Sequence, residues 1–408
     1  MKNIGRQALQ GVKVVDFSWV GVGPLTTKYL ADHGASVIRV ESAQYPETFR
    51  VTVPFKDNVP GINRSGYFAW YNSNKYGLAL DLNKPKGIEV AKRLIAWADI
   101  VVQSFRPGVM KRLGLDYEDL KTVKADIIML SLSAQGQTGP HSQSAAYGIQ
   151  LVGLSGVTDI TGWPDRDPCG PYGAYTDWIA PQFGATVLIS ALNYRRKTGK
   201  GMYIDLSQCE TAIQFLAPLI LNYVVNGQIY SRRGNRSPYA CPHGAYRCKG
   251  EDRWCAIIVS TDNEWQAFCG VLGDPDWSKD PKFSTLLNRK KNEAELDKLI
   301  ESWTIEHRTE KVMFKMQAAG VPAGVVQNSE DLFEHDPQLK SRQFFRRLHH
   351  TEMGDCAYAG PSFRLSKTPC KLERAAPCLG EHTEYVCMEI LGMSDKEFVG
   401  LLNEGIFK

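Results

Sequence analysis

The chain has 408 residues, more than a single hydrophobic core usually holds, so we expect two domains. Apolar residues make up 43% and charged residues 23% of the sequence, which is ordinary for a soluble globular protein. The 48 basic and 44 acidic residues give a net charge of +4, which argues against a nucleic-acid partner because such proteins carry dense positive charge.

The first third of the chain alternates between strand and helix patterns. Residues 12–17 and 35–41 are typical of buried strands, and Pro24 and Gly34 mark the start and the end of a helix between them. The pattern continues with strands at 78–82, 99–105 and 126–133 and helices at 84–98 and 117–123. This alternation predicts the α/β class, with a mainly parallel sheet covered on both faces.

The middle of the chain predicts a long helix at 181–196, a short strand at 202–206 and a second helix at 207–225. The longest apolar run, 212–225, is broken by polar residues and proline and is too short to cross a bilayer. We therefore expect a buried core helix and no membrane partner. The N-terminus lacks the apolar stretch of a secretory signal, which predicts a cytoplasmic protein.

A loop rich in Gly, Arg, Ser and Tyr at 226–242 predicts a domain boundary. Paired strands at 244–248 and 254–260, with helices at 263–272, 293–303 and 309–319, predict a smaller α+β domain. The apolar stretch 321–326 and the C-terminal segments are expected to return to the first domain. The predicted organisation is a large domain of residues 1–225 plus 326–408 and a small domain of residues 226–325.

The ten cysteines include no Cys-x-x-Cys pair, and reduced thiols fit this scatter better than a disulfide framework. Cys241, His243 and Cys248 lie near one another in the sequence, but their spacing matches no common zinc pattern and a fourth ligand is missing. We predict no metal site.

Gly21-Val-Gly23 follows the first predicted strand, and Glu41 lies about twenty residues further on, as in a dinucleotide-binding fingerprint. Pro24-Leu-Thr26 stands where the third glycine is needed, so the match is partial. An NAD-dependent dehydrogenase is the alternative from another reaction class.

Asp177 ends the Gly- and Tyr-rich run 170–177 and precedes a predicted helix. It has the position of an N-cap, the usual role of Asp before a helix. Pro181, however, predicts that the helix begins three or four residues after Asp177, which places the carboxylate in the approach loop. The positive end of the helix favours an ionised carboxylate there, and Tyr175 and Trp178 exclude water, which are conditions that a carboxylate nucleophile needs.

Two basic segments are open to more than one interpretation. Arg195, Arg196, Lys197 and Lys200 suit a helix C-terminus better than a phosphate site. The run 105–114 follows a strand, so its arginines could bind phosphate at the carboxyl end of the sheet or form a solvated turn. Lys75 is equally open.

Ordered landmarks along nearly the whole chain resemble the family III CoA-transferases, the group that includes formyl-CoA, carnitine and benzylsuccinate CoA-transferases. These landmarks are residues 9–17, 74–75, 78–82, 105–108, 112–114, 154–156, Asp177, 197–201, 320–324, 336–338 and 380–383. The resemblance implies a Rossmann-like large domain, a smaller α+β domain and an interlocked dimer. It also implies CoA and acyl-CoA as substrates, no tightly bound cofactor, and Asp177 as the nucleophile of a transferase.

The resemblance further implies positions that contact CoA. They are Gly21, Val22, Ser42, Lys75, Leu80 to Asn83, Ser104, Phe105, Arg106, Arg112 and Tyr147. Ser42 stands where some members have arginine. Tyr147 stands where the acyl-CoA racemases of this family have a histidine, and tyrosine is the weaker general base near neutral pH, which favours a transferase over a racemase.

The acids that are exchanged are less clear from the sequence. Aromatic residues near the expected site could line a pocket for an aromatic or branched acid or could fill the core: Trp19, Trp70, Tyr71, Tyr147, Tyr175 and Trp178. Our hypothesis is transfer from succinyl-CoA to an aryl-substituted dicarboxylate such as benzylsuccinate. Some members pair unlike subunits, so a homodimer, a heteromer and a structural subunit remain open, and Asp177 favours an active subunit.

Overall fold

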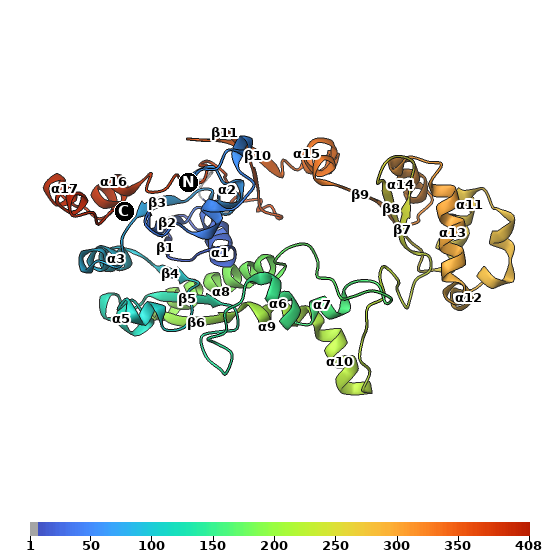
Figure 1. The fold of residues 1–408 in the computed structure, drawn as a ribbon, viewed down its shortest axis with the longest axis horizontal. Coiled ribbons are helices and arrows are strands. Elements are labelled where there is room, and N and C mark those ends of the chain that lie inside the picture. The colour runs from blue at the N-terminus through green and yellow to red at the C-terminus, as the bar shows by residue number, and fades with distance from the viewer. Residues whose placement is uncertain (1–6) are drawn as a thin grey trace. The chain divides into compact units, whose positions relative to one another are not determined.

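The computed structural model describes residues 7–408, and the chain divides into two compact units (Figure 1). The first unit contains the residues up to 157, 170–228 and 338–408, and the second contains 158–169 and 229–337. Both units are therefore assembled from separate stretches of the chain.

The first unit is built on a parallel sheet with the strand order β3-β2-β1-β4-β5-β6. Its strands are β1 (Lys13–Asp16), β2 (Ser36–Glu41), β3 (Tyr76–Ala79), β4 (Ile100–Gln103), β5 (Ile128–Ser133) and β6 (Met202–Ser207). The chain starts at the centre, builds outward to β3, and then reverses direction between β1 and β4, as in doubly wound α/β folds. The predicted α/β class is confirmed, although β3 begins two residues earlier than expected.

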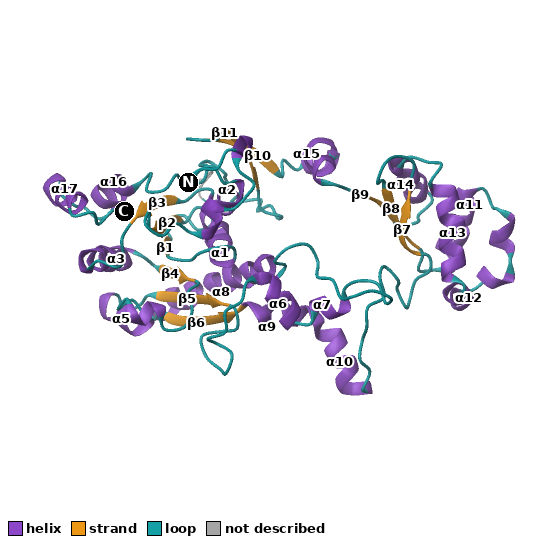
Figure 2. Ribbon diagram, viewed as in Figure 1, coloured by secondary structure: helices purple, strands orange, loops and turns teal. Residues whose placement is uncertain are grey.

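Helices cover both faces of this sheet (Figure 2). On one face lie α1 (Val22–Asp32) and α8 (Thr176–Thr198), and on the other lie α3 (Pro85–Trp97), α4 (Val109–Arg112) and α5 (Tyr117–Val123). The same stretch of the chain also forms α2 (Gly66–Asn72), α6 (Gly148–Leu154), α7 (Val157–Ile160), α9 (Gln208–Ile213) and α10 (Ala217–Asn226). Successive strand residues point to opposite faces, so Val14 packs in one core with α1 and α8 whereas Val15 packs in the other with α3 and α5. All-parallel sheets need this double cover.

The second unit contains a three-stranded antiparallel sheet and its own core. Its elements are β7 (His243–Arg247), β8 (Trp254–Ile258), β9 (Ala323–Val326), α11 (Asp262–Leu272), α12 (Leu286–Lys291), α13 (Glu293–Thr304) and α14 (Thr309–Ala318). The stretch 321–326, expected in the first domain, instead places β9 beside β8. An apolar stretch this short does not by itself reveal which sheet it joins.

The chain then contributes α15 (Pro337–Ser341), and the hairpin of β10 (Phe345–His350) and β11 (Gly354–Ala359) belongs to the first unit. The short helices α16 (Thr383–Tyr385) and α17 (Asp395–Asn403) follow. Val386 and Phe407, near these helices, complete the core on the α3 face of the large sheet. The C-terminal segment thereby returns to the first unit.

Two helix predictions are wrong in detail. The helix predicted at 207–225 breaks into α9 and α10, because Pro218 stands in the first turn of α10. None of the residues of α10 is buried within the chain, although we expected a core helix there. No helix in the described part of the chain is long and apolar enough to span a membrane.

Candidate active site

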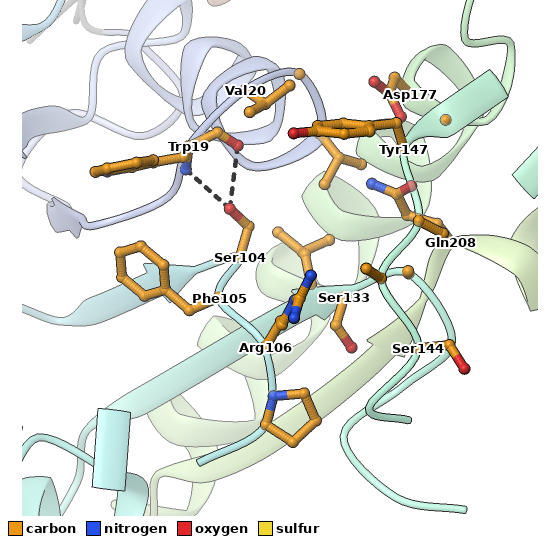
Figure 3. A pocket seen from close by; sticks show the side chains of 18 of the residues that line it. Trp19, Val20, Ser104, Phe105, Arg106, Ser133, Ser144, Tyr147, Asp177 and Gln208 are labelled. Carbon is orange, nitrogen blue, oxygen red and sulfur yellow. Dashed lines mark hydrogen bonds between the residues drawn. The ribbon is translucent and has the colours of Figure 1, made fainter. Parts of the chain in front are cut away.

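A cavity of about 360 Å³ opens at the carboxyl edge of the large sheet (Figure 3). Its walls come from the segments that follow β1, β4, β5 and β6, together with the loop before α6 and the first turn of α8. β1 and β4 are the neighbouring strands at which the winding direction changes, and the crevice at such a point is the usual ligand site of an open α/β sheet.

Asp177 reaches this cavity from the first turn of α8. Our expectation that it lies in the approach loop is wrong, because the helix begins at Thr176 and Pro181 stands inside it. Pro181 has no N–H group to donate to the carbonyl of Asp177, four residues earlier. The helix continues through the missing bond, and its start still places the Asp177 side chain at the cavity.

The backbones of two further helix starts press against the Asp177 carboxylate. A β-carbon at Gly148, the first residue of α6, would lie 2.5 Å from Asp177 Oδ1. A β-carbon at Gly21, the N-cap of α1, would lie 2.9 Å from Asp177 Oδ2. Only glycine allows so close an approach, and it brings the positive ends of α1, α6 and α8 to one carboxylate.

Burial dominates the electrostatics of this carboxylate. It raises the pKa of Asp177 from its ordinary value near 3.8 to about 7, and the Thr176 hydroxyl opposes the rise. The side chain therefore changes its charge near neutral pH and is a stronger nucleophile when ionised than a solvated aspartate. A perturbed carboxyl group in a cavity is a feature of catalytic sites.

The wall opposite Asp177 is stiffened by hydrogen bonds. Ser104 Oγ accepts a hydrogen bond from Trp19 N (2.8 Å) and donates one to Trp19 O (3.1 Å), as Figure 3 shows. The rings of Trp19 and Phe105 meet edge to face with centroids 5.9 Å apart. These contacts join the loops after β1 and β4 into one wall.

Seven of the residues predicted from the sequence come together at this cavity: Gly21, Val22, Ser104, Phe105, Arg106, Tyr147 and Asp177. Four others lie elsewhere in the first unit. The Ser42 hydroxyl donates to Lys408 O (3.3 Å), Leu80 is buried in the core, the Asn83 amide donates to Asp81 Oδ1 (3.1 Å), and Arg112 is exposed at the end of α4. Their contacts with CoA stay predictions.

Lys75 is enclosed by the protein. Its ammonium group donates to Asp16 Oδ2 (3.0 Å), to the carbonyl of Pro24 (2.8 Å) and to Asn72 Oδ1 (2.9 Å), and its side chain is fully buried. A lysine has three donors, and all three are used here. A phosphate contact at Lys75 would therefore require one of these bonds to be given up.

Several cavity residues were not singled out from the sequence. Ser133, the last residue of β5, has a buried hydroxyl with no hydrogen-bond partner among residues 7–408, and Gln208 follows β6. Their place at the carboxyl ends of parallel strands is the signal that identifies them once the strand order is known. Gly148 becomes recognisable only through its approach to Asp177.

The cysteine and histidine cluster considered for a metal has a different environment. Burial raises the pKa of Cys241 to about 12 and that of Cys248 to about 11, so both thiols stay protonated. Residues 7–408 contain no group of three side chains arranged to hold a metal ion.

Comparisons with known proteins give one consistent family. A family model described as CoA-transferase family III matches residues 9–383. Human succinyl-CoA:glutarate CoA-transferase is 30% identical over 407 residues, which cover 100% of this chain and 91% of that protein. Succinyl-CoA–D-citramalate CoA-transferase from Chloroflexus aurantiacus is 30% identical over 397 residues, 96% of each chain. The beta subunit of succinyl-CoA–L-malate CoA-transferase from the same organism is 27% identical over 405 residues, 98% of each chain.

A solved structure agrees with these relatives. The crystal structure of a CaiB/BaiF family protein from Brucella suis matches with a TM-score of 0.86 and 30% identity, covering 94% of this chain and 100% of that one. The family model and the relatives each span most of the chain, and the fold is shared as well. The chain therefore belongs to CoA-transferase family III and is a CoA-transferase.

Proposed function

We propose that this CoA-transferase moves CoA from succinyl-CoA to a second carboxylic acid and that Asp177 carries the transfer. The observation on which this proposal depends is the buried carboxylate of Asp177, with a pKa of about 7, at a cavity on the carboxyl edge of the sheet. The donor is suggested by the relatives, whose names specify succinyl-CoA.

The first half of the reaction loads the enzyme. An Asp177 oxygen attacks the acyl carbonyl of the donor, the C–S bond breaks, and CoA leaves as a thiolate from a mixed anhydride. The thiolate then attacks the aspartyl carbonyl, which releases the donor acid as a carboxylate and leaves an aspartyl-CoA thioester. Because CoA is retained covalently, the activation of the thioester is not lost to hydrolysis.

The second half reverses these steps with another acid. A carboxylate oxygen of the acceptor attacks the aspartyl carbonyl and expels the CoA thiolate, forming a second mixed anhydride. The thiolate attacks the acyl carbonyl that came from the acceptor, so the new acyl-CoA forms and Asp177 is released as a carboxylate. No external energy source is needed, since one thioester is exchanged for another.

Each attack produces an oxyanion that needs hydrogen-bond donors. The start of α1 suits this role, because no side chain caps it and Gly21 and Val22 both line the cavity. An amide that donates to such an oxyanion is typically worth about 3–4 kcal/mol in the transition state. We therefore propose that the first backbone N–H groups of α1 donate hydrogen bonds to the oxyanion of each tetrahedral intermediate.

Arg106 is the cation of the cavity wall, and Figure 3 shows it well away from Asp177. A guanidinium group binds phosphate oxygens through two parallel hydrogen bonds. We propose that the pyrophosphate of CoA lies toward Arg106 and its thiol toward Asp177. The predicted CoA contacts of Ser42, Leu80, Asn83 and Arg112 belong to this same proposal, whereas the donors of Lys75 are already used within the protein.

The acceptor is proposed to be a short dicarboxylate, because the related transferases are named for glutarate, citramalate and malate. An aryl-substituted succinate such as benzylsuccinate is the second candidate, supported by the aromatic rings of Trp19, Phe105 and Tyr147 at the cavity. Tyr71 and Trp178, whose ring centroids lie 5.3 Å apart, pack against each other and do not line it. A screen of these acids with succinyl-CoA, read by mass spectrometry of the acyl-CoA products, separates the candidates.

We also propose that the chain assembles with a second copy of itself. Some relatives are named as alpha and beta subunits of one transferase, so a heteromer is the competing arrangement. Asp177 makes this chain an active subunit in either case. Purification of the chain alone, followed by an exchange assay, distinguishes the two arrangements.

Trapping the covalent enzyme tests the central role of Asp177. The wild-type protein is mixed with succinyl-CoA in the absence of an acceptor, quenched in acid, digested and mapped by mass spectrometry, and we expect CoA on the peptide that contains residue 177. Asp177→Ala should lose both the label and the turnover while CoA binding, measured by calorimetry, changes little. Asp165→Asn, at an exposed carboxylate, is the matched control. Turnover by Asp177→Ala, or a label on another residue, refutes the assignment.

A further inference from the structure

A second cavity, of about 270 Å³, lies within the second unit and is lined by cations. Its walls are formed by Arg232, Arg233, Arg236, Lys290, Ser237, Pro238 and Pro164. The transfer chemistry at Asp177 uses none of these residues.

The cations of this cavity are only partly neutralised. Arg232 Nη1 donates to Asp159 O (3.1 Å) and to Asp159 Oδ1 (3.4 Å), but its Nε is buried and has no hydrogen-bond partner among residues 7–408. The Arg233 guanidinium lies 4.2 Å from the centroid of the Tyr230 ring and has no carboxylate partner in the same described range. Both arginines therefore have N–H groups that can still donate hydrogen bonds to a ligand.

The other two cations share a single carboxylate. Lys290 Nζ lies 2.6 Å from Glu293 Oε2, and Arg236 Nε lies 3.6 Å from the same oxygen. The nearby carboxyl group of Asp297 accepts a hydrogen bond from Tyr246, and burial raises its pKa. Four cations thus face the paired carboxylates of Asp159 and Glu293 and the nearby carboxylate of Asp297, which leaves a formal excess of one positive charge.

The loop that carries the arginines is held in place before any ligand arrives. Arg236 N donates to Arg233 O (3.2 Å) across a tight turn, and Gly234 N donates to Gly162 O (2.8 Å). A β-carbon at Gly234 would lie 2.4 Å from the Trp163 ring, so the turn packs directly on that side chain. Such preorganisation lowers the entropic cost of binding.

We propose that this cavity binds a phosphate dianion. Guanidinium groups match the geometry of phosphate oxygens through paired hydrogen bonds, and both Arg232 and Arg233 keep N–H groups that can donate to a ligand. The phosphate could be free inorganic phosphate or the 3′-phosphate of CoA, which present the same chemistry. The site is independent of the role proposed for Asp177.

Calorimetric titration of the full chain with inorganic phosphate, at pH 8 and constant ionic strength, tests the site. We expect saturable binding of one phosphate per chain. Arg233→Gln and Arg236→Gln should each weaken it by about tenfold, the scale of one charge-assisted hydrogen bond. Arg233→Lys keeps the positive charge but lacks the paired N–H donors of a guanidinium group, so its loss of phosphate affinity should be smaller than that of Arg233→Gln.

Arg308→Gln is the matched control, since it removes an exposed arginine of the same unit outside the cavity and should bind phosphate normally. Asp177→Ala should also bind phosphate normally, which separates this result from any failure of the proposed reaction. If CoA displaces the bound phosphate and dephospho-CoA does not, the natural occupant is the 3′-phosphate of CoA. If neither compound displaces it, the occupant is free phosphate.

Three results would overturn the proposal. The first is the absence of saturable phosphate binding by the wild-type protein. The second is unchanged binding in both glutamine variants, provided that their circular dichroism spectra match the wild type. The third is an affinity for glutarate that is higher than the affinity for phosphate and that both glutamine variants lose, which would make the cavity a dicarboxylate site.

Discussion

Asp177 combines properties that compete with each other. A carboxylate removed from water is reactive, but its burial disfavours the charged form and raises its pKa to about 7. The three helix starts around it act in the opposite direction, because their positive ends favour the anion. The ionised Asp177 therefore destabilises the folded protein, and the reaction requires this ionised form.

The pH dependence of the reaction follows from this pKa. Only the ionised carboxylate can attack the donor, so kcat/KM should fall about tenfold for each pH unit below about 7. Initial rates with succinyl-CoA, measured between pH 5 and 9, will show whether kcat/KM falls in this way at acidic pH. A rate that is flat down to pH 5 would contradict the raised pKa of Asp177.

The same shift predicts that Asp177→Asn stabilises the protein. The folded pKa lies above the unfolded value, so the folded state binds the extra proton and stability decreases as pH rises from about 4 to 7. Above pH 7 the variant should gain up to about 4 kcal/mol, the equivalent of the shift, and near pH 4 it should gain nothing. Thermal melts at pH 4.5 and pH 8 measure the difference, and Asp165→Asn should show no such dependence.

Gly148 is predicted to be essential for placing the carboxylate. The new β-carbon of Gly148→Ala would meet Asp177 Oδ1 at 2.5 Å and Ala174 Cβ at 2.4 Å, so the nucleophile must move. A displacement of about 1 Å can cost about 100-fold in rate, and we expect a loss of that size in kcat/KM. Gly400→Ala, in α17 with nothing within 4 Å of the added carbon, should keep full activity.

At the scale of the elements, a buried ionic network joins the strands beneath the site. Asp16 of β1 contacts Arg39 of β2 and Lys75, which directly precedes β3. Burial alone would raise the pKa of Asp16, but Lys75 and Arg39 lower it to about 2. This ionised Asp16 stabilises the fold above about pH 4, and the contribution is lost as pH falls toward 2.

Lys75→Met tests whether this lysine supports structure or binds CoA. Removing one partner of a buried pair typically costs about 3–5 kcal/mol, so the variant should unfold well below the wild-type temperature. CoA affinity of the folded variant should stay near the wild-type value, because the Lys75 donors are occupied within the protein. A large loss of affinity with little loss of stability would instead place Lys75 at the CoA site. Lys121→Met, at an exposed ion pair, is the control.

At the scale of the whole molecule, α10 shows apolar surface that the single chain leaves uncovered. Its exposed side chains include Ile220, Leu221, Tyr223, Val224 and Val225. Exposed apolar patches of this kind usually mark an interface. The helix thus supports the proposal of self-association.

Charges placed on α10 should disturb that assembly. We expect the wild-type chain to have at least twice its monomer mass by light scattering and the double variant Val224→Asp, Val225→Asp to shift toward the monomer. Lys298→Asp, an exposed change in the second unit, should leave the mass unchanged. A monomeric wild-type protein would contradict the proposal.

The sequence by itself determined the α/β class and most strands of the large sheet, because hydrophobic period, proline and glycine act locally. The family resemblance singles out Asp177, and the local signal of Pro181 places the start of its helix wrongly. The tertiary structure decided which residues share one cavity, since strand order brings the ends of β1, β4, β5 and β6 together. It also decided that Lys75 is enclosed, that β9 joins β8 and that Gly148 touches Asp177. These are contacts between residues far apart in the chain, and no local pattern specifies which distant backbone will be the neighbour.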